Sequence, residues 1–148
     1  MGEKTVYILG AGFSKIAGAP LIDEFLQEAK NIYANKREQL SEEEFHYFKT
    51  VFDYQEKLSS VRTRVNFDID NIEDFFSIID MESIYNKNTQ LKKIKKSLIY
   101  LIIKTLELNI KNVATPSFVN LVQDAYRKFF VNIDNSNSLI TFNYDLLI

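Results

Sequence analysis

Two short groups of residues in this chain have types and spacing suited to binding an anionic ligand. The first is Gly10-Ala11-Gly12 with Ser14, which directly follows the apolar run from Val6 to Leu9. Glycine permits a sharp turn with positive φ. If a helix begins after the turn, its free N–H groups and its dipole point toward a phosphate, and Ser14 adds a hydroxyl. The alternative is a tight strand-to-helix turn that binds nothing.

The second group is Asn143 and Asp145, which follow the apolar segment from Ser138 to Phe142. In an open α/β sheet the ligand lies at the carboxyl ends of the strands. We therefore expect these two side chains at the same sheet edge as the glycine turn. The alternative is that Asn143-Tyr144-Asp145 is a polar turn in which Asp145 caps a following helix.

The glycine turn differs from the two commonest nucleotide-binding patterns. Lys15 stands where the dinucleotide-binding pattern G-x-G-x-x-G has its third glycine. No Gly-Lys-Ser/Thr follows at the spacing of a P-loop. The glycines alone therefore leave both explanations of the turn open.

Both groups lie within longer motifs that resemble those of the sirtuin superfamily. Gly10-Ala11-Gly12-Phe13-Ser14, followed by Ala17-Gly18-Ala19-Pro20, is similar to the sirtuin opening motif G-A-G-x-S-x-x-A/S-G-x-P. Thr141-Phe142-Asn143-Tyr144-Asp145 is similar to the sirtuin T-Q-N-I-D. The variant forms F-S-K and F-N-Y-D resemble the sirtuin-like NAD-hydrolysing domains of bacterial anti-phage defence proteins more than protein deacylases. Between its two ends the chain resembles that group only in its helical character.

The resemblance implies that the chain binds NAD as a substrate and that the intact protein hydrolyses it to nicotinamide and ADP-ribose. The bond broken is a glycosidic bond, so a water must be placed at the sugar carbon. Asn143 would be the catalytic residue, holding the ribose and ordering that water, and Asp145 would hydrogen-bond the nicotinamide amide. The cofactor-binding residues implied are Gly10, Ala11, Gly12, Ser14, Pro20 and Asp145.

The chain also departs from the sirtuin pattern. The catalytic histidine of sirtuins follows the second motif, so it would lie past Ile148, and His46 falls in a helical segment and cannot replace it. Leu21-Ile22-Asp23 replaces the sirtuin Asp-Phe-Arg. We therefore expect these residues alone to turn over NAD very slowly or not at all. The alternatives are an NAD-dependent protein deacylase and a catalytically silent nucleotide-binding or assembly domain.

The elements that must position the motifs are two strands separated by a long helical block. The strands are expected at residues 6–9 and 138–142, and the helices at residues 20–36, 42–58, from 72, 89–110 and from 116. The first strand is a short apolar run without charge, so we expect a parallel strand that is buried on both faces. Expected caps are Ser41 with Glu44, Asp70 with Glu73, and Thr115 ahead of Pro116. The alternative for Asp70, Glu73 and Asp74, implied by the resemblance of N-I-E-D-F-F to the defence-type domains, is that an acidic residue faces the pocket. The inward helix faces expected from helical spacing are Leu91, Ile94, Leu98, Leu101, Ile102 and Thr105, and Phe118, Leu121, Val122, Ala125 and Phe129. The fold class expected is α/β, an incomplete Rossmann-like parallel sheet with a large helical insertion, mostly helical by residue count.

We expect residues 1–148 to be the N-terminal part of one sirtuin-like domain. The strand and glycine loop occupy residues 5–18, the helical block 20–131, and the second strand with its Asn-x-Asp motif 138–145. The second strand ends close to Ile148, which leaves only two recognisable strands in the sheet. A homo-oligomer or a defence-system partner is expected to form through the missing C-terminal part.

The composition of the chain limits which kinds of partner and metal site are expected. The chain is 46% hydrophobic, which indicates a globular protein, and its formal net charge of −2 gives no reason to expect nucleic acid or a membrane surface as a partner. It has no cysteine and one histidine, so we expect no metal site within these residues and a cytoplasmic location. The lysines at 92, 93, 95 and 96 are expected to be a solvated helix face, or else a contact for a partner or nucleic acid.

Overall fold

Helices make up most of the chain, and its two strands form one small parallel sheet, as expected for an α/β chain. The computed structural model describes residues 4–61, 68–86, 89–112, 116–134 and 136–141. These residues fall into two compact units, one within residues 1–21 and 106–148 and the other within residues 22–105. Each unit is described by itself.

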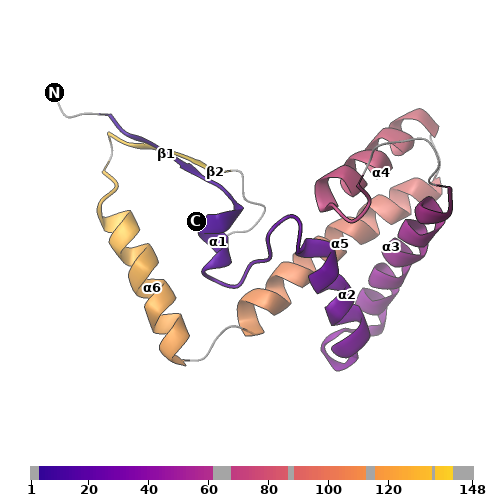
Figure 1. Ribbon diagram of the computed structural model, residues 1–148, viewed down its shortest axis with the longest axis horizontal. Helices are drawn as coiled ribbons and strands as arrows, with labels where there is room; N and C mark the ends of the chain where they lie inside the picture. The colour runs from indigo at the N-terminus through magenta and orange to yellow at the C-terminus, as the bar shows by residue number, and fades with distance from the viewer. Residues whose placement is uncertain (1–3, 62–67, 87–88, 113–115, 135, 142–148) are drawn as a thin grey trace. The chain divides into compact units, whose positions relative to one another are not determined.

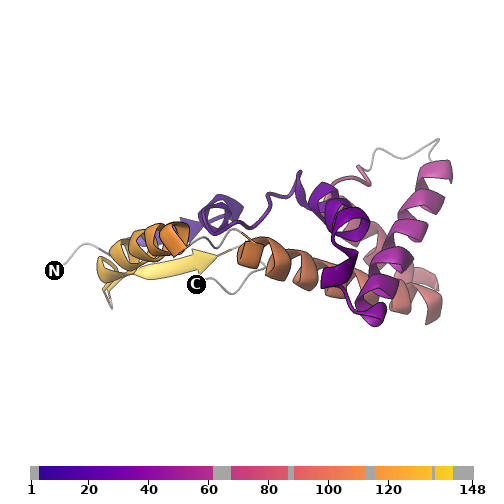
Figure 2. The ribbon, with the colours of Figure 1, turned by 90° about the horizontal axis from the view of Figure 1, so that it is seen from below.

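The first unit contains the parallel sheet (Figure 1). Strand β1 (Val6–Leu9) pairs with β2 (Ser138–Thr141), and the register places Leu9 opposite Thr141. Helix α1 (Ala11–Lys15) comes directly after β1 (Figures 1 and 2), and α6 (Pro116–Val131) precedes β2. The predicted first strand is confirmed. The predicted last residue of the second strand, Phe142, lies outside the described residues.

Helix α6 packs on one face of the sheet through aromatic side chains. The ring of Phe129 lies 5.5 Å from that of Tyr7, and both side chains are half-buried. Side chains alternate along a strand, so Val6 and Ile8 point to the opposite face, where they are 56% and 67% exposed. The prediction of a strand buried on both faces is therefore wrong for the described residues, because α6 covers only one face.

The buried stripe of α6 is rotated from the predicted one. Val122 is buried as expected, but Leu121 is 65% exposed. The ring of Tyr126, which was not predicted to face the core, lies 4.9 Å from that of Phe13. The helix begins at Pro116 as predicted, while the expected cap at Thr115 lies outside the described residues.

The second unit is a group of packed helices: α2 (Phe25–Asn35), the short 3-10 helix η1 (Arg37–Gln39), α3 (Glu42–Val61), α4 (Ile72–Asn86) and most of α5 (Thr89–Asn112). Helix α2 begins at Phe25 with Glu24 at its N-cap, so the prediction of a helix starting at Pro20 is wrong. Tyr33 of α2 stacks on Phe45 of α3 at 4.7 Å.

Helices α3 and α5 run antiparallel. Glu44 near the start of α3 pairs with Lys104 late in α5, and Tyr47 stacks on Tyr100 at 4.6 Å. The predicted capping box is confirmed, since the Ser41 N–H donates to the Glu44 carboxylate at 2.7 Å and the Glu44 N–H donates to the Ser41 hydroxyl at 3.2 Å.

Helix α4 is capped by Asn71 and not by the predicted Asp70. The Asn71 side-chain oxygen accepts hydrogen bonds from the backbone N–H groups of Glu73 at 2.9 Å and Asp74 at 3.3 Å. The Asp70 carboxylate instead accepts hydrogen bonds from Lys30 and from Gln55, a buried residue of α3. Asp70 therefore joins α2 and α3 to the start of α4.

The core of this unit is apolar and formed by all four helices. The predicted inward face of α5 is confirmed at Leu91, Ile94, Leu98, Leu101 and Thr105. The other helices contribute side chains that are 0% or 1% exposed, namely Leu26, Ala29, Ile32, Phe48, Val51, Phe75 and Ile79.

Candidate functional site

The glycine turn lies at the sheet edge where β2 also ends. Because the strands are parallel and Leu9 pairs with Thr141, Gly10 leaves β1 level with the last described residue of β2. The predicted positions Asn143 and Asp145 follow Thr141 in the sequence, but both lie outside the described residues.

The backbone of the turn does not use positive φ at its first glycines. Gly10 is extended, with φ −106° and ψ −178°, and its carbonyl accepts a hydrogen bond from the Phe13 N–H at 2.9 Å. Among the described glycines only Gly18 is left-handed, with φ 94°. The positive φ that glycine permits is therefore not used at Gly10 or Gly12, and among the described glycines it occurs at Gly18.

Gly10 and Gly12 face open space. Beyond the neighbouring backbone, a Cβ built on either residue would have no described heavy atom within 4 Å, and both residues are exposed. Neither backbone conformation nor packing among the described residues therefore requires glycine at these two positions. The absence of a Cβ leaves the main chain at these two positions open to close approach.

The other predicted cofactor-binding residues that the structure describes are more buried than Gly10 and Gly12. Ser14 is only 1% exposed, and its carbonyl accepts hydrogen bonds from the N–H groups of Ala17 at 3.0 Å and Ala19 at 3.2 Å. Ala11 and Pro20 are half-buried. Ser14 thus organises the segment behind the turn, and its predicted contact with a phosphate stays a prediction.

Helix α6 holds the turn in place through Tyr126. The Tyr126 hydroxyl donates a hydrogen bond to the Phe13 carbonyl at 2.8 Å. Phe13 also lies against Phe129, with ring centroids 5.2 Å apart. The sequence pattern did not single out Tyr126, although its spacing from Val122 and Phe129 matches one helical face.

Within the described ranges, no group of three or more histidine, cysteine, aspartate or glutamate side chains could hold a metal ion. In the same part of the chain, no helix is both long enough and apolar enough to cross a membrane. His46 is an exposed residue of α3. Comparison of the chain with protein-family models, with curated proteins and with solved structures found no match.

Proposed function

We propose that this chain binds NAD, with the diphosphate against the glycine turn at the carboxyl edge of a Rossmann-like sheet. The observation that carries the proposal is the open space in front of Gly10 and Gly12. Glycine at two exposed positions, without a conformational or packing requirement, suits a backbone that a phosphate must approach closely. The parallel pairing of β1 with β2 supports the same edge as the place of the second motif.

The reaction proposed is hydrolysis of the nicotinamide–ribose bond, which in bacterial anti-phage defence would deplete NAD. In this proposal Asn143 holds the ribose and orders the attacking water, and Asp145 hydrogen-bonds the nicotinamide amide. Both residues follow β2 closely in the sequence, and β2 ends level with the glycine turn. The carboxyl edge of a parallel sheet is where α/β proteins place their ligand.

A catalytically silent nucleotide-binding domain is the second candidate. The open space at Gly10 and Gly12 favours it equally, because a phosphate ligand alone accounts for those glycines. The two functions differ in turnover, so affinity for NAD and release of nicotinamide must be measured separately.

The test is Asn143→Ala, with Asn132→Ala as the control. Asn132 is an exposed asparagine just after α6 whose side chain donates to the Lys128 carbonyl. In the intact protein, we expect Asn143→Ala to lower the rate of nicotinamide release by at least about a hundredfold, roughly 2.7 kcal/mol, without changing the thermal midpoint. If Asn143 only caps a turn, the variant should instead lose about 1 kcal/mol of stability and keep its turnover.

Calorimetry with NAD completes the test. Saturable NAD binding without nicotinamide release by the unsubstituted intact protein would support the silent nucleotide-binding domain. Absence of NAD binding would contradict both candidates. Asn132→Ala should match the unsubstituted protein in affinity and in turnover.

A further inference from the structure

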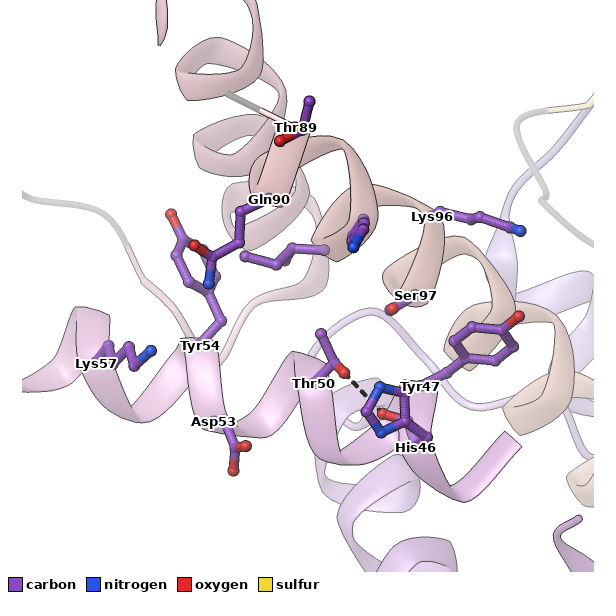
Figure 3. A pocket seen from close by; sticks show the side chains of 12 residues that line it. His46, Tyr47, Thr50, Asp53, Tyr54, Lys57, Thr89, Gln90, Lys96 and Ser97 are labelled. Atoms are coloured by element: carbon purple, nitrogen blue, oxygen red, sulfur yellow. Dashed lines mark hydrogen bonds between the residues drawn. The ribbon is translucent and has the colours of Figure 1, made fainter. Parts of the chain in front are cut away.

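A cavity of about 640 Å³ lies between α3 and the first half of α5, within the second unit. Lys57 and Gln90 flank one end of this α3–α5 groove, and His46 and Ser97 flank the other (Figure 3). Its volume falls in the range of small-molecule sites, roughly 300–1,000 Å³. The proposed function does not use this groove.

The groove carries an excess of positive charge. Lys57, Lys93 and Lys96 contribute to its lining, against the single carboxylate of Asp53. Lys57 and Lys93 make no ion pair with any of the residues that the structure describes, and Lys96 lies over the ring of Tyr100 at 5.5 Å. The amines are therefore available to an anion.

The carboxylates around the groove are already engaged. Asp53 pairs with Lys49 at 2.8 Å and points away from α5 in Figure 3. The hydroxyl of Tyr54, a lining residue, donates to Glu82, and that of Tyr47 donates to Glu43. Lys49 therefore balances the charge of Asp53, which is the one carboxylate among the described residues that line the groove.

Ser97 supplies an independent sign of a ligand. Its residue is 4% exposed and lines the groove, yet its hydroxyl makes no hydrogen bond to the described residues. The Ser97 oxygen is not among the fully buried side-chain atoms that lack a partner, so it is open to the groove. Serine in a helix usually donates to a carbonyl of the preceding turn, and this hydroxyl does not. In Figure 3 the hydroxyl points into the space between the helices.

The N-terminus of α5 adds to the same site. Thr89 and Gln90 line the groove from the first turn of this 24-residue helix. Backbone N–H groups in the first turn have no acceptor within the helix, and the helix dipole favours negative charge there. The amines, the serine hydroxyl and the helix N-terminus all favour one kind of ligand.

We propose that the α3–α5 groove binds a small molecule that carries a chain of phosphates, such as a nucleoside triphosphate. Phosphate oxygens accept charge-assisted hydrogen bonds from Lys57 and Lys93, and Ser97 donates its hydroxyl to the bound molecule. A small ligand fits better than nucleic acid, since the volume of the groove is limited and the chain as a whole has a net charge of −2.

The test is calorimetric titration of the whole chain with ATP, using Lys57→Gln/Lys93→Gln as the variant. The control is Lys92→Gln/Lys128→Gln, which changes the net charge equally at two exposed lysines outside the groove. We expect one saturable site whose affinity falls at least about tenfold in the groove variant, because charge-assisted hydrogen bonds are strong, and stays within about twofold in the control. Ser97→Ala should also weaken binding, and circular dichroism should show an unchanged thermal midpoint for both lysine variants.

Titrations with other ligands identify which part of the molecule is recognised. Inorganic triphosphate should bind if phosphates alone are recognised, and tighter binding of ATP indicates a nucleotide. The proposal is overturned if ATP does not bind, if both lysine variants lose affinity equally, or if a single-stranded oligonucleotide binds more tightly than ATP. Loss of ATP binding in Gly12→Ala, with the groove variant unaffected, would also overturn it by moving the site to the glycine turn.

Discussion

Replacing Gly12 by alanine separates a ligand-binding role of the glycine turn from a structural one. Gly12 lies inside α1, and an added Cβ has open space in front of it. Alanine is more favourable than glycine in a helix by about 0.8–1.0 kcal/mol, and α1 has only five residues. We therefore expect a gain in stability between zero and about 1 kcal/mol, or a rise in thermal midpoint of up to about 4 °C.

The same substitution should weaken NAD binding. The new methyl group stands where a phosphate would approach the main chain, so the N–H groups can no longer be reached at hydrogen-bond distance. We expect affinity to fall at least about tenfold, or 1.4 kcal/mol. Thermal denaturation and calorimetry with NAD on the same preparation give both quantities.

Gly18→Ala is the matched control, because Gly18 is a glycine with a conformational requirement. Its φ of 94° lies in the region that L-residues avoid, at a cost of about 1–3 kcal/mol. This variant should lose stability, whereas Gly12→Ala should not. A Gly12→Ala protein that is destabilised by more than about 1 kcal/mol and binds NAD normally would refute the ligand-binding role of the turn.

Two further substitutions test how each unit is held together. Tyr126→Phe keeps the ring but removes the donor to the Phe13 carbonyl, so it should cost about 0.5–1.5 kcal/mol of stability and reduce NAD affinity, measured by denaturation and calorimetry. Burial would raise the pKa of Glu44, but hydrogen bonds from the Ser41 N–H and from Lys104 outweigh it and hold that pKa below its usual value. Because the folded pKa is the lower one, this stabilisation is present above the unfolded pKa and is lost as pH falls through the folded pKa. Glu44→Gln should therefore lower stability by about 1–2 kcal/mol at neutral pH. Urea denaturation of both proteins should show that this difference in stability disappears in acid. A difference in stability that stays constant from neutral to acid pH would contradict the role of the carboxylate.

Local signals in the sequence predicted most helices well. The capping box of Ser41 and Glu44 was predictable because both of its hydrogen bonds form within one helical turn. The buried face of α5 followed from helical spacing. The start of α2 did not, because proline at a first helical position is only a preference, and the chain continues beyond the left-handed turn at Gly18 to Phe25 before it becomes helical.

The position of the candidate site could be predicted from the sequence, but the contacts that hold the glycine turn in place could not. The position of the glycine turn follows from a short apolar run that ends in glycine, and parallel pairing brings β2 beside it. The hydrogen bond from Tyr126 to Phe13 joins residues 113 positions apart and depends on how α6 rotates against β1. The α3–α5 groove likewise depends on which side chains meet across two antiparallel helices, so its lysines looked like a solvated face in the sequence.

The exposed face of β1 shows why packing on α6 matters to the site. An uninterrupted apolar run predicts burial on both faces, yet α6 covers only the face of Tyr7, and Val6 and Ile8 stay exposed. Within the described residues, the cohesion of the sheet therefore depends on one aromatic layer, in which Phe129 touches both Tyr7 and Phe13. Phe13 belongs to α1, so the contacts that hold α6 to the sheet also fix the glycine turn. Loosening α6 must then lower stability and ligand affinity together, whereas alanine at Gly12 should lower affinity without lowering stability.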